Sequence, residues 1–344
     1  MSGVTEPRGR FPDAAASGTA LWFPRPLAVE LRREPVPRPA SDEVMVEAVA
    51  SAVSHGTEML VHRGEVPDGL ELDLPTLRGS FRFPIKYGYA SAGRVVEAGP
   101  EVARPAVGDL VFVHHPHQAA YVVPAEMAIR LPSGLDPLRG VFLANVETAT
   151  NVVLDAAPRF RERAVVFGQG TVGLLITQLL RRTGVARITV VDPVARRRDL
   201  ARRVGADDAL ASGDALDGAD FDLAIEASGH PPALDAALRS VAFGGTVIVC
   251  SWYGTKPVPV MLGGPFHRRR LRIISSQVST IDGALQPRWS RQRRLEVARE
   301  LLPELELTAL ISHRFPIERA AEAYALLDSR PEDTVQVVLT YASR

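Results

Sequence analysis

The chain has 344 residues, 46% of them hydrophobic, which is enough for two domains of ordinary size with a substantial core. Its 40 lysines and arginines balance 40 aspartates and glutamates, so nothing in the charge favours nucleic acid or an anionic membrane as a partner. A single cysteine, Cys250, excludes an internal disulfide and a zinc site built from several cysteines. The sequence has no apolar run of transmembrane length and no signal-peptide core near its start, so we expect a cytoplasmic protein.

The first part of the chain, residues 20–147, combines short strands with loops. Gly, Pro, Ser and Ala are frequent in residues 1–19, where we expect a disordered leader. Apolar, often β-branched runs between turn residues predict strands at 44–49, 93–99, 108–113 and 121–123. Several short strands at this spacing predict a small barrel-like β domain.

Residues 148–276 have a different pattern, in which strands alternate with helices. The predicted strands are 165–168, 188–192, 221–226, 245–251 and 271–275, and the predicted helices are 174–183, 197–205 and 231–241. This alternation predicts an α/β domain with a doubly wound parallel sheet. The tail, residues 277–344, returns to the first pattern, with helices at 295–302 and 317–327 and a strand at 334–340. We expect the short basic runs 268–270 and 291–294 to be solvated.

A glycine motif lies where the first strand of the second region meets its helix. Gly168 permits a tight turn, Gly170 lets the backbone approach a pyrophosphate, and Gly173 lets the helix pack closely on the strand. Thr171 and Val172 open the helix, whose free N–H groups and partial positive charge attract phosphates. The alternative is a glycine turn that binds nothing, but the strand–turn–helix–strand context favours a nicotinamide dinucleotide.

The choice between NAD and NADP depends on the residues that follow the second strand of this region. Asp192 ends that strand, and its carboxylate would accept hydrogen bonds from the adenosine ribose and repel a 2′-phosphate. Arg196, Arg197 and Arg198 follow closely and weaken this inference. We therefore predict NAD as cofactor and leave NADP open.

The order of parts resembles the medium-chain dehydrogenase/reductase superfamily of zinc-type alcohol dehydrogenase-like proteins. Similar motifs are Gly-Asp at 108–109, Ile-Glu-Ala-Ser-Gly at 225–229 and Ile-Ser-His-Arg-Phe at 311–315. The Gly-Thr-Glu run at 56–58 is also similar to the bacteriochlorophyllide hydroxyethyl dehydrogenase branch. The resemblance implies a GroES-like β-barrel catalytic domain (20–147 and 277–344), a Rossmann domain (148–276), and a homodimer or homotetramer. It implies hydride transfer at the nicotinamide and cofactor contacts by Thr148, Arg197, Ala227 and Ser228.

The chain departs from the zinc-binding members at the expected metal ligands. His55 stands in place of a cysteine, Tyr89 in place of a histidine, and Ala144 in place of a cysteine or glutamate. Zinc needs three or four converging ligands, and one histidine does not supply them. We therefore predict a zinc-free member with no metal.

Without a metal, side chains must manage the substrate proton. We predict His55 as proton acceptor and Tyr89 with Thr57 as hydrogen-bond partners of the developing oxyanion. Simpler roles remain open for each. His55 or Thr57 would then serve only as a local hydrogen-bonding group, and Tyr89 would only fill the volume of the missing metal.

Further polar residues are candidates for the substrate pocket. His115 and His117, with His114, would bind a polar substrate, form a solvated loop cluster, or join His55 around a metal. Glu147 would pair with His55 or with a substrate amine or hydroxyl, or stabilise a helix N-terminus. Residues 59–87 are predicted to be a long loop that walls the pocket and favours a substrate larger than ethanol.

Three functions fit these observations. The first is a zinc-independent NAD(H)-dependent oxidoreductase that acts on a secondary alcohol or ketone. The second is an NADPH-dependent reductase of a polarised C=C or C=N bond, with Tyr89 as proton donor. The third is a dinucleotide-binding protein that has lost catalysis.

Overall fold

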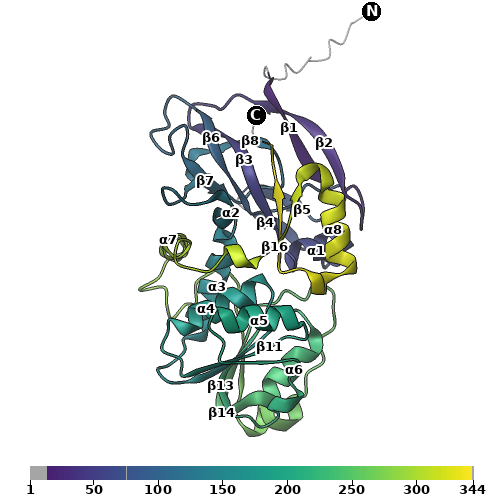
Figure 1. Cartoon of the computed structure of the whole chain (residues 1–344), viewed down its shortest axis with the longest axis vertical. Coiled ribbons are helices and arrows are strands. Elements are labelled where there is room, and N and C mark those ends of the chain that lie inside the picture. The colour runs from purple at the N-terminus through teal and green to yellow at the C-terminus, as the bar shows by residue number, and fades with distance from the viewer. Residues whose placement is uncertain (1–13, 75, 343–344) are drawn as a thin grey trace, which may run out of the picture.

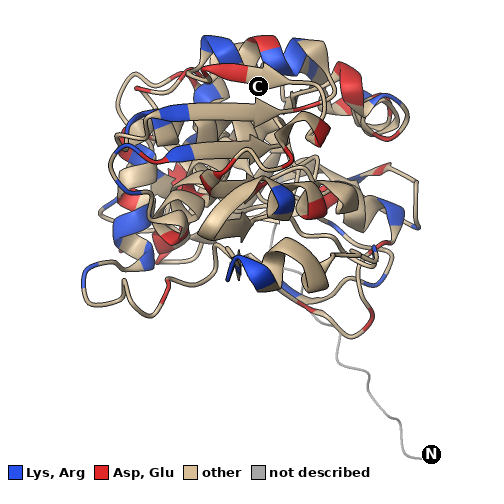
Figure 2. Ribbon diagram, turned by 90° about the horizontal axis from the view of Figure 1, so that it is seen from below, with Lys and Arg blue, Asp and Glu red and all other residues tan. Residues whose placement is uncertain are grey.

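The computed structural model describes residues 14–74 and 76–342. The β-rich domain lies at one end of the long axis and the parallel-sheet domain at the other (Figure 1). The predicted α/β fold, with a GroES-like and a Rossmann part, is confirmed. No helix in these two described ranges is long and apolar enough to cross a membrane. In the view of Figure 2, basic and acidic residues are interspersed over the ribbon.

The β-rich domain is built on a seven-stranded sheet ordered β16-β17-β3-β6-β7-β9, with β8 also paired to β3. Its strands are β3 (Glu43–Val53), β6 (Ser91–Ala98), β7 (Leu110–Val113), β8 (Ala120–Pro124), β9 (Ile129–Arg130), β16 (Ile311–Pro316) and β17 (Gln336–Thr340). Val338 of β17 lies opposite Ala52 of β3 in antiparallel register. The tail therefore joins the domain that the first part of the chain begins.

A second, two-stranded sheet shortens the expected leader. Strand β1 (Ala14–Trp22) pairs antiparallel with β2 (Glu30–Pro37), and Leu21 lies opposite Leu31. Residues 14–19 of the predicted leader are therefore a strand, because pairing with β2 satisfies their backbone hydrogen bonds. Residues 1–13 lie outside the described part of the chain.

The segment expected to be a long loop contains secondary structure. Helix α1 (Thr57–Arg63) ends at Gly64, whose φ of 73° gives the left-handed turn that glycine adopts without strain. The hairpin of β4 (Glu71–Leu74) and β5 (Leu77–Ser80) follows. The prediction for 59–87 was wrong to this extent, because such short elements depend on contacts with the rest of the fold.

The Rossmann domain has a six-stranded parallel sheet ordered β12-β11-β10-β13-β14-β15. Its strands are β10 (Arg163–Phe167), β11 (Arg187–Val191), β12 (Asp208–Leu210), β13 (Phe221–Glu226), β14 (Val241–Val249) and β15 (Arg272–Ser275). Its helices are α4 (Thr171–Arg181), α5 (Ala195–Arg203) and α6 (Pro231–Ser240). The strand order reverses between β10 and β13, so ligands are expected outside the carboxyl ends of these two strands.

The remaining helices join the domains or complete the tail. They are α2 (Pro137–Gly140), α3 (Leu143–Ala156), α7 (Arg291–Leu301) and α8 (Ala320–Ser329). Short turns of other helical types are η1 (Ala125–Met127), η2 (Asp214–Leu216), η3 (Leu262–Phe266), η4 (Thr308–Leu310), η5 (Ile317–Arg319) and η6 (Pro331–Asp333). One apolar cluster includes Phe112 of the β-rich domain, Leu143 of α3 and Val166 of the Rossmann sheet, so the core continues from one domain into the other.

Candidate functional site

The glycine turn follows β10 at the point where the strand order reverses. Gly168 has φ 89°, and a Cβ there would lie 2.6 Å from the Cα of Ser228. A Cβ on Gly173 would lie 1.9 Å from the carbonyl oxygen of Gly168, so α4 packs on the turn only with glycine at this position. A Cβ on Gly170 would meet nothing within 4 Å. The turn thus leaves open space beside Gly170, where the resemblance implies a pyrophosphate.

Helix α4 begins against the tail of the chain. The Thr171 hydroxyl donates to the carbonyl of Val335 at 2.9 Å and contacts Oε1 of Gln336 at 3.1 Å. Val172 follows in the first turn, whose N–H groups have no partner within the helix. The helix N-terminus therefore lies where the Rossmann domain meets the β-rich domain.

Asp192 follows β11 beside this turn and is only 2% exposed. Its Oδ2 accepts a hydrogen bond from the Gln169 backbone N–H at 2.7 Å, and its Oδ1 accepts one from the Val194 N–H at 2.9 Å. These bonds hold the carboxylate in the position predicted for the acceptor of the adenosine ribose.

The arginines after Asp192 bind carbonyl groups. Arg197 donates to the carbonyls of Thr334, at 2.8 Å, and Pro331, at 2.5 Å, and its Nη1 lies 3.8 Å from Oδ2 of Asp192. Arg198 donates to the backbone carbonyl of Asp192 at 2.8 Å. Arg197 therefore bridges the Rossmann domain to the tail, besides lying near the carboxylate expected to hold the ribose.

A buried carboxylate that sequence reasoning missed shapes the loop after β13. Oε1 of Glu226 accepts hydrogen bonds from the Ser228 N–H at 2.7 Å and the Gly229 N–H at 3.1 Å, and its Oε2 accepts one from the Tyr253 hydroxyl at 2.7 Å. Glu226 is fully buried. It thus fixes Ala227 and Ser228, the two loop residues expected at the cofactor. In the sequence, the signal for this role was an acidic residue, Glu226, at the end of an apolar strand.

The structure brings together Tyr89 and Thr57, two of the three predicted catalytic residues. The Tyr89 phenol is hydrogen-bonded by the hydroxyls of Ser54 and Thr57. Burial raises the pKa of Tyr89 to about 12, and the charge of Glu58 acts in the same direction. The phenol therefore stays protonated at neutral pH and can donate a hydrogen bond.

His55 precedes Thr57 in the chain, and one nitrogen of its ring is buried. Its Nε2 is buried and has no hydrogen-bond partner among the described residues. Burial lowers the pKa of His55 to about 3, and electrostatic interactions with Arg197 and His313 act in the same direction. The imidazole is therefore neutral, and this low pKa makes it a weaker base than the sequence analysis expected.

A buried hydrogen-bond network surrounds Glu58, the residue that follows Thr57. Glu58 is fully buried, and its Oε2 accepts hydrogen bonds from the Tyr324 hydroxyl and from Nε2 of His117, both at 2.8 Å. Its Oε1 accepts one from the Ser54 N–H at 2.9 Å. Nδ1 of His117 meets the Ser51 hydroxyl at 2.6 Å. Glu58 thereby holds the backbone that carries His55 and Thr57.

His115 and His117 do not form the polar pocket wall that the sequence analysis expected. His117 is fully buried in the Glu58 network. His115 stacks on Tyr121 with the ring centroids 3.7 Å apart, and its Nδ1 lies 2.9 Å from the Pro116 carbonyl. Burial lowers the pKa of His115 to about 3. Both rings are therefore part of the interior. Their burial also contradicts the alternative of a solvated loop cluster.

Glu147 pairs with an arginine rather than with His55. Its Oε1 lies 2.8 Å from Nη2 and 3.1 Å from Nε of Arg294, which is 2% exposed. Nη1 of Arg294 also donates to Oδ1 of Asn151 at 2.6 Å. Arg294 was expected to be solvated, and this was wrong because α7 packs on α3. The Thr148 hydroxyl donates to the Ala144 carbonyl at 2.9 Å within α3.

The residues at the expected metal position do not fit zinc. They offer one imidazole, one phenol and the methyl group of Ala144, where zinc needs at least three nitrogen, sulfur or carboxylate ligands. Within residues 14–74 and 76–342, no group of three or more His, Cys, Asp or Glu side chains is arranged to hold a metal ion. No catalytic step is therefore assigned to a metal here.

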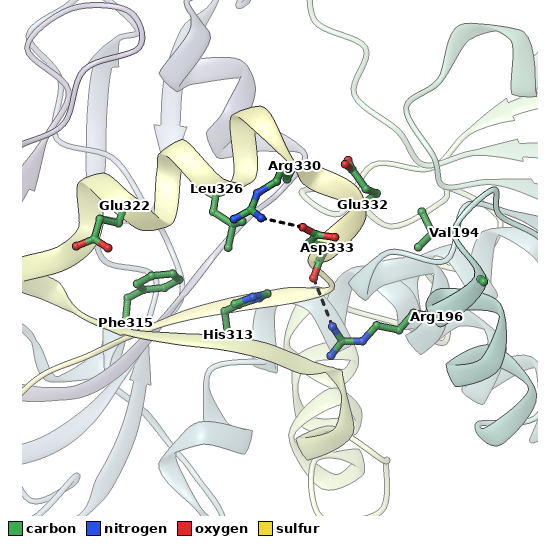
Figure 3. Close-up of a pocket in the computed structure, with 10 residues that line it drawn as sticks. Val194, Arg196, His313, Phe315, Glu322, Leu326, Arg330, Glu332 and Asp333 are labelled. Carbon is green, nitrogen blue, oxygen red and sulfur yellow. Dashed lines mark hydrogen bonds and ion pairs between the residues drawn. The ribbon is translucent and has the colours of Figure 1, made fainter.

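A cavity of about 640 Å³ lies near the adenosine end of the expected cofactor site (Figure 3). It opens between the start of α5 and the elements β16, α8 and η6. Arg196 lies on one side and His313 and Phe315 on the other. Arg196 donates to the Asp333 carbonyl at 3.4 Å, and Nη1 of Arg330 lies 3.5 Å from Oδ2 of Asp333. The cavity thus lies where the Rossmann domain meets the tail.

Comparisons with known proteins agree with this architecture. The family model of zinc-binding dehydrogenases matches residues 171–292. D-guloside 3-dehydrogenase of Escherichia coli is 29% identical over 329 residues, which cover 88% of this chain and 93% of that enzyme. The chain is an oxidoreductase, similar over most of its length to these dehydrogenases. The 2-desacetyl-2-hydroxyethyl bacteriochlorophyllide A dehydrogenase of Cereibacter sphaeroides is 28% identical to this enzyme over 344 residues, which cover 94% of this chain and 98% of that protein.

Solved structures share the fold of this oxidoreductase. An alcohol dehydrogenase of Escherichia coli in complex with NADH superimposes with a TM-score of 0.76 and 20% identity, over 94% of this chain and 100% of that one. A zinc-binding dehydrogenase of Sinorhizobium meliloti bound to NADP gives a TM-score of 0.75 and 20% identity, over 94% and 99% of the two chains. Nicotinamide dinucleotides of both kinds thus occur with this fold.

Proposed function

We propose that the enzyme transfers a hydride between NAD(H) and a secondary alcohol or ketone of a polar substrate larger than ethanol, without zinc. One observation carries the proposal. At the positions where the zinc-type relatives keep metal ligands, this chain has a neutral phenol held by two hydroxyls and an imidazole nitrogen without a partner. These groups can bind the reacting oxygen directly.

The cofactor would lie along the glycine turn. Gly170 leaves room for the pyrophosphate, the start of α4 offers N–H groups to it, and Asp192 accepts hydrogen bonds from the ribose. The bound cofactor supplies the hydride acceptor or donor at its nicotinamide. We keep NAD as the preferred cofactor because the Asp192 carboxylate repels a 2′-phosphate.

The side chains of the cluster handle the oxygen and its proton. The Tyr89 phenol, oriented by Ser54 and Thr57, donates a hydrogen bond to the substrate oxygen as negative charge develops there. Nε2 of His55 accepts the hydrogen bond of the substrate hydroxyl. Because the pKa of His55 is about 3, the imidazole releases the proton that it accepts to solvent water and returns to its neutral form.

Two substitutions test this assignment. In Tyr89→Phe and His55→Gln, kcat should fall by about 100-fold or more, because each loses a group that acts on the proton. Affinity for NADH, measured by fluorescence titration, should change little. Tyr121→Phe removes a phenol hydroxyl that bonds Ser91 elsewhere in the domain and serves as the matched control. Wild-type kcat in both site variants would contradict the proposal.

The pH dependence gives an independent test. If neutral His55, with a pKa of about 3, and protonated Tyr89, with a pKa of about 12, are the active forms, both persist between about pH 5 and 9. The kcat/KM profile should therefore be flat across that range. An inflection near pH 6.5 would show that a histidine with an ordinary pKa carries the proton.

A second candidate is reduction of a polarised C=C or C=N bond by NADPH. The phenol of Tyr89 favours it, since such a reduction needs a protonated donor near neutral pH. Cofactor preference and a panel of enones against secondary alcohols separate the two reactions. Faster turnover of enones with NADPH would favour the second.

A further inference from the structure

A second cavity, of about 310 Å³, lies in the β-rich domain between helices α1 and α8 (Figure 1). Helix α8 lines it with one face, because Ala321, Ala325 and Asp328 recur every three or four residues. His62 of α1 also lines it, together with Leu27 on the segment between β1 and β2. The lining is thus separate from the predicted catalytic residues and from the glycine turn.

His62 brings a polar group without a partner to this cavity. The residue is 3% exposed, and its Nδ1 is buried and has no hydrogen-bond partner in the part of the chain that the structure describes. Its ring packs with those of Phe23 and Tyr324, whose centroids are 5.0 and 5.1 Å away. Burial lowers the pKa of His62, and the electrostatic interaction with Asp328 acts in the opposite direction. The imidazole is therefore neutral at pH 7, and a ligand that bonds its free nitrogen would recover the free energy that this unpaired atom costs.

Leu27 adds an exposed apolar side chain with a strained backbone. Its φ is 60°, in the left-handed region that a leucine adopts only at a cost. The Leu27 N–H donates to the His62 carbonyl at 2.7 Å, which holds the backbone in this conformation. The side chain is 59% exposed. A strained residue that presents an apolar side chain beside a cavity indicates a surface that a ligand covers.

The other polar groups of the cavity are hydrogen-bond acceptors. The Asp328 carboxylate accepts a hydrogen bond from Nε of Arg63 at 2.7 Å and can accept further donors. The Ser329 hydroxyl donates to the Ala325 carbonyl at 2.7 Å, which leaves its oxygen as an acceptor. Among the described residues that line the cavity, none is a lysine or an arginine. Together with the aromatic ring of Tyr324, these acceptors favour a ligand that is positively charged and rich in N–H donors.

We propose that this cavity binds a small primary alkylammonium ion, with its N–H groups on His62 and Asp328 and its alkyl chain on Leu27. Ligand pockets in proteins measure about 300–1,000 Å³, so a cavity of about 310 Å³ limits the chain to a few carbon atoms. The site goes beyond the proposed function and does not depend on it, since none of these groups acts on the hydride or on the substrate proton.

Ligand-observed NMR titration of the full-length enzyme tests the site without substrate or cofactor. The probes are n-butylammonium, which stays protonated at neutral pH as a lysine side chain does, 1-butanol and butyrate. We expect n-butylammonium to bind one site with a Kd on the order of 1–10 mM, about fivefold or more tighter than 1-butanol, and butyrate not to bind. His62→Phe keeps an aromatic ring without the nitrogen, and Asp328→Asn removes the charge. Each should weaken n-butylammonium about fivefold or more.

Two further variants complete the test. Ala325 is exposed, so Ala325→Leu should fill the cavity without disturbing the core and weaken n-butylammonium about tenfold or more. Asp199→Asn breaks a surface ion pair with Arg202, as Asp328→Asn does with Arg63, and should bind like the wild type. Thermal unfolding shows whether each variant is folded.

Three results would overturn the proposal. The first is the lack of saturable n-butylammonium binding to the wild type. The second is equal binding to the wild type and to folded Ala325→Leu or Asp328→Asn. The third is binding of 1-butanol or butyrate as tight as that of n-butylammonium, since the site would then not select a positive charge.

Discussion

At the residue scale, substitutions of the glycines after β10 distinguish an effect on stability from an effect on cofactor binding. In Gly173→Ala the new Cβ would lie 1.9 Å from the Gly168 carbonyl oxygen, so the free energy of unfolding should fall by about 1–3 kcal/mol. In Gly170→Ala the Cβ meets no protein atom within 4 Å, so stability should stay within about 0.5 kcal/mol. The same methyl group should weaken NADH binding about tenfold or more, because it occupies the space expected for the pyrophosphate. Urea unfolding and fluorescence titration measure the two effects, and unchanged NADH affinity in Gly170→Ala would contradict this account.

Single residues could be predicted from the sequence where their surroundings are local. The positions of Gly168 and Asp192 follow from a strand, a turn and a helix that are adjacent in the chain. His117 and Glu147 could not be placed in this way, because their partners are distant: Glu58 lies 59 residues from His117, and Arg294 lies 147 residues from Glu147. Only the packed fold shows that these polar side chains are paired in the interior.

At the element scale, Arg294 clamps α7 onto α3. Its guanidinium donates to Glu147 and Asn151 of α3 and to the carbonyl of Thr280, at 3.1 Å, on the segment between. Arg294→Met leaves Glu147 buried without its partner, so the free energy of unfolding should fall by about 3–5 kcal/mol. The double variant Arg294→Met/Glu147→Leu should recover much of this loss. A loss of less than about 1 kcal/mol in urea unfolding of the single variant would argue against the clamp.

Elements with strong periodicity were predicted well, and short ones were not. Apart from the short strand β12, which was not predicted, the strands and helices of the Rossmann domain lie within a few residues of their predicted bounds. Apolar runs such as that of β10 and the apolar residues of α4 are buried and gave the clearest signals. Helix α1 and the β4–β5 hairpin were missed. They are short, and their apolar residues Met59, Val61 and Leu72 become buried only against the β-rich domain.

At the scale of the whole molecule, the sheet edge formed by β15 is exposed. Ile273 on this strand is 39% exposed, and Leu262 in η3 is 44% exposed. An uncovered edge strand with apolar residues favours pairing with another chain. We propose a homodimer or homotetramer through this edge. Ile273→Lys should lower the mass measured by light scattering to that of the monomer, and a monomeric wild type would contradict the proposal.

The order of parts was predictable because each region has its own period of apolar residues. That the tail completes the β-rich domain came from the resemblance, and β17 pairing with β3 agrees with it. The cavity between α1 and α8 was not predictable, because it depends on how a helix of the tail packs on the first part of the chain.

The central claim is that side chains, not a metal ion, manage the substrate proton. The most direct test is metal analysis of the purified active enzyme by inductively coupled plasma mass spectrometry, followed by activity measurement after dialysis against a chelator. The account predicts far less than one zinc ion per subunit and unchanged kcat after chelation. Stoichiometric zinc, or activity that chelation removes and added zinc restores, would contradict it.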